Sequence, residues 1–121
     1  MRPPAILLVD HGSRRAEANA VLDAIAGLLR RRLPGRVVEI AHLELAPPTI
    51  DEGIDACIRA GAREIVVHPF FLTPGSHGAG DVPALAAAAA DRHSGVSIRV
   101  TAPLGAHEAL VDVILARIEA A

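Results

Sequence analysis

Aromatic side chains are almost absent from this chain, which has two Phe and neither Tyr nor Trp among its 121 residues. Proteins that bind single-stranded nucleic acid stack bases on aromatic rings, and duplex binders present a basic surface. Here 12 Lys and Arg stand against 14 Asp and Glu, so the formal net charge is -2. The composition therefore argues against nucleic acid as a partner.

Cysteines and long apolar runs are also scarce. Cys57 is the single cysteine, which excludes an internal disulfide and a thiolate metal cluster and is typical of a reducing compartment. The apolar run before Asp10 spans only residues 5–9, too short for a signal-peptide core or a membrane span. We therefore expect a cytoplasmic protein without a membrane partner.

Core-forming residues, by contrast, are plentiful. Hydrophobic residues make up 51% of the chain and charged residues 21%, a balance that supports a packed core. The length is usual for one domain, and no linker or internal repeat divides the sequence. We expect a single domain over residues 1–121.

Apolar runs of strand length alternate with segments of helical periodicity. Strands are predicted at residues 5–9, 36–41, 64–68 and 96–101. Helices are predicted at residues 16–33, from the cap Thr49 to Gly61, from the cap Asp81 to about Gly95 with Pro83 in the first turn, and at residues 107–119. A loop rich in Gly and Pro is expected over residues 69–80.

The first two helices have apolar positions at helical spacing, and these are expected to face the core. They are Val21, Leu22, Ile25, Leu28 and Leu29 in the first helix and Ile50, Ile54, Cys57 and Ile58 in the second.

Four strand–helix units in strict alternation predict a three-layer α/β fold with helices on both faces of a parallel sheet. Right-handed crossovers and the flavodoxin-like arrangement give the strand order 2-1-3-4. In such sheets, ligands bind beyond the carboxyl ends of the strands. The polar residues that follow each strand are therefore the candidates for a functional site.

Histidines gather at this edge of the predicted sheet. Those at or beyond the end of a strand are His11, His42, His68, His77 and His107, whereas His93 is expected near a helix end. We interpret His68 as a structural imidazole and His107 as the residue that opens the last helix.

The set His11, Glu44 and His77 is different, because the order 2-1-3-4 places the three loops that carry these residues side by side. Two imidazoles and a carboxylate suit divalent Fe, Co, Ni or Zn and leave coordination positions open. The same residues are equally compatible with a polar rim that only caps helices, and the spacing leaves both interpretations open.

Several motifs in order resemble one family along nearly the whole chain. They are HGSRR at residues 11–15, HLELAP at 42–47, PFFLTPGSH at 69–77, DVP at 81–83 and TAPLG at 101–105. This run resembles the small class II chelatases, the CbiX-type and SirB-type sirohydrochlorin chelatases. The resemblance implies a chelatase-like fold and metal insertion into sirohydrochlorin, a tetrapyrrole rich in carboxylates.

The resemblance also implies roles for particular residues. The metal-binding and catalytic set of the family maps to His11, Glu44 and His77. Ser13, Arg14, Arg15 and Ser76 are the candidates for contacts with substrate carboxylates, although Arg15 could equally be a solvated residue of the first helical turn. Relatives of the SirB type carry a basic residue and a bulky one around the loop His, where Ser76 and Gly78 stand here.

The resemblance further implies a divalent metal as substrate and no organic cofactor. Iron is favoured, for sirohaem synthesis, and cobalt or nickel, in cobalamin-type synthesis, is the alternative. A single unit offers only an open rim, so we expect a homodimer that encloses the macrocycle. Phe70, Phe71 or Leu72 would lie near the substrate or the subunit contact, or would only pack the end of the third strand.

These residues also suggest two functions other than metal insertion. His11-Gly12 after a strand is also found in histidine phosphatases, but those carry an Arg directly before that His, where Asp10 would repel a phosphate. A carrier of metal or tetrapyrrole would use the same rim without turnover.

Overall fold

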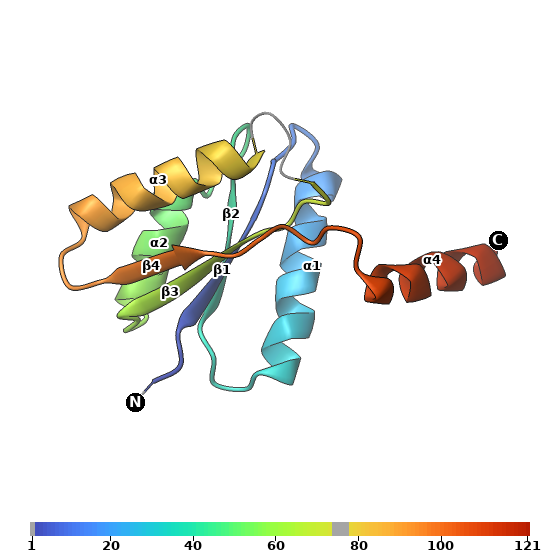
Figure 1. Cartoon of the computed structure of the whole chain (residues 1–121), viewed down its shortest axis with the longest axis horizontal. Helices are drawn as coiled ribbons and strands as arrows, with labels where there is room; N and C mark the ends of the chain where they lie inside the picture. Colours follow the sequence, from blue (N-terminus) through green and yellow to red (C-terminus); the bar gives the residue numbers. More distant parts are fainter. Residues whose placement is uncertain (1, 74–77) are drawn as a thin grey trace.

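One four-stranded parallel sheet organises the computed structural model, which describes residues 2–73 and 78–121. The strands lie in the order β2-β1-β3-β4, as the sequence predicts. In chain order the elements are β1 (Ala5–Asp10), α1 (Ala16–Arg32), β2 (Val38–His42), α2 (Ile50–Arg59), β3 (Glu64–Pro69), α3 (Gly78–Arg92), β4 (Ser97–Val100) and α4 (Glu108–Ala120). This confirms the predicted α/β class (Figure 1).

The sheet has a hydrophobic cluster on each face, because successive side chains of a strand point to opposite sides. Leu7 and Val9 of β1 pack with α2 and α3 in the larger cluster. Leu8 packs with Leu22 and Ala26 of α1 in the smaller one. The three layers are therefore α1, the sheet, and α2 with α3 (Figure 1).

Helix α2 lies close against the sheet and begins as predicted. Thr49 caps it in a capping box with Glu52, and Ile54 and Cys57 are fully buried. A Cβ at Gly53 would stand 2.7 Å from Cδ1 of Leu7, so a larger residue here would force the Leu7 side chain to shift.

The predicted inward face of α1 is partly wrong. Leu22 is buried and Ile25 and Leu29 pack against the core, but Val21 and Leu28 are 54% and 55% exposed. The apolar arc of this helix is wider than the strip of sheet that it covers, so the side chains at its margins stay in solvent.

Helix α3 begins earlier than predicted, at Gly78, so Asp81 lies inside the helix rather than at its N-cap, and Pro83 lies beyond the first turn. Gly78 and Gly80 have low helix propensity and read as loop in the sequence. Smaller differences occur in β2, which begins at Val38 and reaches His42, and in β4, which is shorter than predicted.

Helix α4 covers neither face of the sheet. It projects from the body of the molecule after an extended connection (Figure 1), and none of its residues is buried. Its exposed apolar side chains are Val111, Val113, Ile114, Leu115 and Ile118. No helix in the described part of the chain is long and apolar enough to span a membrane.

Candidate functional site

The loops that carry His11 and Glu44 are paired beyond the ends of β1 and β2. Asp10 and His42 are partners in the parallel register of the two strands. The backbone pairing continues past them. Leu43 N donates to the main-chain carbonyl oxygen of Asp10 (2.8 Å), and Glu44 N donates to that of His11 (3.0 Å). The structure therefore brings these two candidate ligands to adjacent positions on the carboxyl edge of the sheet.

Gly12 makes this pairing possible. Its φ of +86° lies in the left-handed region, and a Cβ built on it would stand 1.9 Å from the carbonyl oxygen of Glu44. No other residue fits there without a shift of one loop, so the glycine of the first loop is required by the approach of the second.

The third loop reaches the same edge through the end of β3. Phe70 N donates to the oxygen of Val9 (2.6 Å), so the chain after β3 continues beside the start of the first loop. The buried ring of Phe71 stacks on the exposed imidazole of His11. Phe70 packs on the α1 side of the sheet, as the packing interpretation expects, while Leu72 is exposed.

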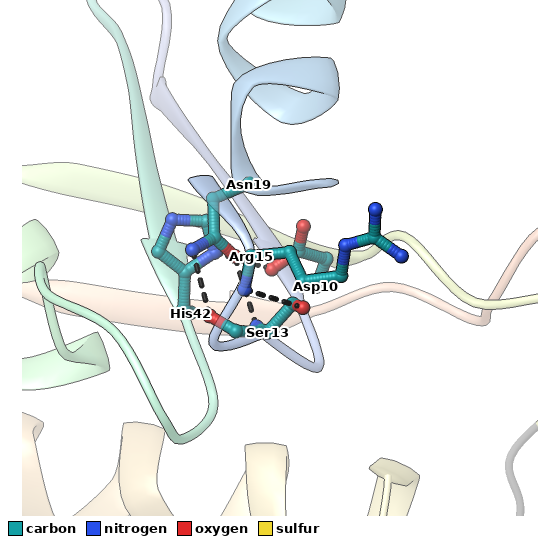
Figure 2. A network of polar contacts seen from close by, with 5 residues as sticks. All are labelled: Asp10, Ser13, Arg15, Asn19 and His42. Atoms are coloured by element: carbon teal, nitrogen blue, oxygen red, sulfur yellow. Dashed lines mark hydrogen bonds and ion pairs between the residues drawn. The ribbon is translucent and has the colours of Figure 1, made fainter. Parts of the chain in front are cut away.

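A side-chain network surrounds the first loop (Figure 2). Nδ1 of His42 donates to Oδ1 of Asp10 over 2.5 Å. Asn19 of α1 holds Ser13 at both backbone groups, accepting from Ser13 N (2.9 Å) and donating to its oxygen (2.8 Å). The Ser13 hydroxyl accepts from Arg15 N (3.0 Å), which fixes the entry into α1.

Sequence reasoning gave no role to the pair of Asp10 and His42. Both stand at the ends of strands predicted to be neighbours, so their facing positions were a usable signal. The burial of His42, which is 2% exposed, could not be read from the sequence.

His77 and Ser76 lie outside the described residues. Within the residues that the structure does describe, no group of three His, Cys, Asp or Glu side chains is placed to hold a metal ion. His11 and Glu44 are thus two candidate members of the predicted donor set, and the third candidate, His77, lies outside the described residues.

The other candidates of the rim have definite surroundings. Arg14 is exposed, whereas the guanidinium of Arg15 forms an ion pair with Glu17 (2.7 Å). His107 caps α4, since its Nδ1 accepts from Ala109 N (3.0 Å), as predicted. His68 bonds Oγ1 of Thr101 (2.7 Å), and burial lowers its pKa below the ordinary value, which supports its structural interpretation.

Cys57 is a structural residue of the core. It lies on the buried face of α2, and burial raises the pKa of its thiol to about 12, with the charge of Glu39 adding to the effect. Such a thiol stays protonated at neutral pH and is inert as a ligand or nucleophile.

The architecture matches solved chelatases. SirB from Bacillus subtilis in complex with cobalt superposes with a TM-score of 0.88 at 35% identity, over 98% of this chain and 50% of that one. SirB from Bacillus subtilis with Fe3+ gives a TM-score of 0.85 at 34% identity, over 96% of this chain and 46% of that one. The fold is therefore that of an α/β chelatase.

The family follows from the sequence comparisons. The CbiX family model matches residues 5–121, and the chain belongs to that family. Over 114 residues it is 46% identical to a chloroplastic sirohydrochlorin ferrochelatase of Arabidopsis thaliana, covering 94% of this chain and 51% of that protein. It is 30% identical to a sirohydrochlorin cobaltochelatase of Methanocaldococcus jannaschii, covering 93% of this chain and 96% of that protein. The chain thus spans about half the length of the ferrochelatase and nearly all of the cobaltochelatase.

Proposed function

We propose that this chain is one chelatase unit that inserts a divalent metal ion into sirohydrochlorin, with Fe2+ as the preferred metal. The observation that carries the proposal is the pairing of the loops that hold His11 and Glu44, whose backbones bond beyond the strand ends. An imidazole nitrogen and a carboxylate oxygen on one rim are suited to divalent Fe, Co or Ni.

His77 is the proposed third ligand. The loop that contains it leaves β3, and β3 lies next to β1 in the sheet, so the loop starts from the side of His11. Three protein ligands leave positions at which pyrrole nitrogens can replace water on the metal. The metal is a substrate here, so it must be held weakly enough to be released.

The rim can also accept the protons that the macrocycle loses. Metal insertion displaces both pyrrole N–H protons, and a base must take them up. A neutral imidazole or the carboxylate of Glu44 becomes free to do so as it releases the metal. His11 and Glu44 are exposed, so a flat ligand can reach them from solvent.

Arg14 is the strongest candidate for binding the carboxylates of the substrate. It lies in the first loop and is exposed, and it forms no ion pair within the described residues. Arg15 is already paired with Glu17, which favours its alternative role in the first turn of α1. The Ser13 hydroxyl accepts one hydrogen bond and can still donate its own hydrogen to a carboxylate. Ser76 remains a proposed contact.

Iron is proposed first because the relative with 46% identity is named a ferrochelatase. Cobalt is the alternative, since the shorter relative with 30% identity is named a cobaltochelatase, and nickel suits the same donors. A competition assay with equal Fe2+, Co2+ and Ni2+ under anaerobic conditions decides between them.

We further propose that two copies of the unit form a homodimer around the macrocycle. The exposed apolar side chains of α4 support this, because such a face is usually covered by a partner. An open groove of about 470 Å³ runs beside α4 and is lined by Leu72, Gly105, Leu110 and Ile114, among others. It joins α4 to the segment after β3 that leads from the site.

Multiple turnover tests the enzymatic proposal against a carrier. With excess sirohydrochlorin and Fe2+, a chelatase converts many equivalents of the macrocycle per protein, which changes its visible absorbance. A carrier stops after about one equivalent. Reaction no faster than in a protein-free control would contradict the proposal. We also propose a cytoplasmic location, because a single free cysteine is typical of a reducing compartment.

A further inference from the structure

We infer that Asp10 and His42 form a positioning pair that fixes the spacing between His11 and Glu44 and so sets the affinity of the site for a divalent metal. The inference rests on the proposed function, because it takes His11 and Glu44 as ligands. Neither Asp10 nor His42 is itself proposed as a metal ligand.

Asp10 and His42 lie at the strand ends from which the two loops start, and we call these two positions the loop roots. Asp10 is the residue before His11, and His42 stands two residues before Glu44. The two side chains are cross-strand partners on the α1 face of the sheet, with the Asp10 side chain 20% and the His42 side chain 3% exposed. An imidazole that donates to a carboxylate in such a dry position is held by a short, charge-assisted bond.

This bond is the only side-chain hydrogen bond between the two loop roots among the described residues. The other ties are the two backbone bonds that follow it, from Leu43 to Asp10 and from Glu44 to His11. Backbone bonds at the end of a parallel ladder fray easily, because no further strand holds them. The side-chain bond therefore fixes the distance at which the last backbone pair closes.

The far side of the first loop is fixed independently. Asn19 of α1 clamps Ser13 at its nitrogen and its oxygen, three residues after Asp10 (Figure 2). His11 thus lies on a short segment with both ends anchored, one at the pair and one at α1. Loss of the pair releases one end only, so the loop shifts without unfolding.

Stability alone does not account for a pair of this kind. Two apolar side chains of similar size at buried facing positions are often as stabilising as an ion-capable pair, or more so. A directional bond gives a defined distance, which apolar packing does not. Metal coordination needs such definition, since ligand atoms must lie at about 2.0–2.2 Å from the metal.

Titration with Co2+, read by its visible absorbance, measures the effect directly. We expect His42→Phe and Asp10→Ala each to weaken Co2+ binding about tenfold, the usual scale for residues that orient metal ligands. The double variant should bind Co2+ no more weakly than whichever single variant binds it less tightly, because both substitutions remove the same hydrogen bond. His42→Asn should restore most of the affinity, since its amide nitrogen stands where Nδ1 stands in histidine.

Leu22→Ala is the matched control. Leu22 is buried on the same face of the sheet, so its truncation lowers the melting temperature without touching either loop root. All variants are titrated well below their melting temperatures. The control should bind Co2+ like the wild type while His42→Phe does not.

Two results overturn the inference. Wild-type affinity in His42→Phe, or an equal loss in Leu22→Ala at matched melting temperature, would show that the pair is only structural. The proposed metal site fails separately if His11→Ala and Glu44→Gln bind Co2+ as the wild type does. Loss in His11→Ala with an intact His42→Phe leaves the metal site standing and removes the positioning pair alone.

Discussion

The imidazole of His11 stacks on the ring of Phe71, with the ring centroids 4.2 Å apart and the planes inclined by 26°. Phe71 belongs to the hydrophobic cluster that α2 and α3 form with the sheet. The candidate ligand is therefore oriented by the core, although it is itself exposed to solvent.

Phe71→Leu is expected to weaken metal binding, because His11 loses the ring that orients it. The substitution removes a ring contact worth about 0.5–1.5 kcal/mol, so the affinity for Co2+ should fall by roughly two- to tenfold. Phe70→Leu is the matched control, because Phe70 packs on the opposite face of the sheet. Equal Co2+ affinities in the two variants would contradict an orienting role for the stack.

Gly12→Ala is expected to cost far more stability than Gly35→Ala. Both glycines have φ above +80°, so each substitution carries the left-handed penalty of about 1–2 kcal/mol. Only Gly12 also faces a carbonyl oxygen at 1.9 Å, whereas a Cβ at Gly35 meets open space. Urea denaturation should give a loss of about 3 kcal/mol or more for Gly12→Ala. Similar losses for both would show that the two loops can separate without cost.

His68 is expected to make the fold less stable as the pH falls. Burial lowers its pKa in the folded state below the ordinary 6.5, so the unfolded chain binds more protons in that range. The free energy of unfolding therefore decreases as the pH drops below about 6.5. His68→Gln should flatten this slope between about pH 7 and pH 5, measured by denaturation at several pH values. Parallel curves for the variant and the wild type would exclude the contribution.

Charge on the apolar face of α4 is expected to separate the proposed dimer. Ile114→Asp and Ile118→Asp place a carboxylate on side chains that are 56% and 64% exposed, so the fold of each copy should survive. Sedimentation velocity should show a dimer for the wild type and a monomer for the variants. Val21→Asp, at an exposed apolar position of α1, is the control. A wild-type protein that is monomeric while it catalyses insertion would refute the proposed dimer around the macrocycle.

Periodicity and turn chemistry predicted the fold class, and the strand order followed from right-handed crossovers and the flavodoxin-like arrangement. The alternation of apolar runs with helical patterns indicated four strand–helix units, and Thr49 marked the start of α2. The exposure of Val21 and Leu28 could not be predicted, because it depends on how much of the sheet lies under α1. The projection of α4 is likewise a tertiary property, because the sequence predicts a helix here but not what the helix packs against.

The sequence predicted that the loops of His11 and Glu44 lie together, but not which contacts hold them there. Position after a strand indicated His11 and Glu44, and the strand order placed their loops together. The close approach at Gly12 and the stack on Phe71 depend on distances across the sheet, which a sequence does not contain. The same holds for the bond between Asp10 and His42, because a facing position does not reveal that the imidazole is buried.

The rate of Fe2+ insertion into sirohydrochlorin by His11→Ala, compared with the wild type, tests the central claim most directly. His11 is exposed, so the variant should keep its folded circular dichroism spectrum. The account predicts that insertion is abolished in His11→Ala and in His77→Ala, and slowed in Glu44→Gln. Turnover at the wild-type rate in the folded His11→Ala variant would contradict it.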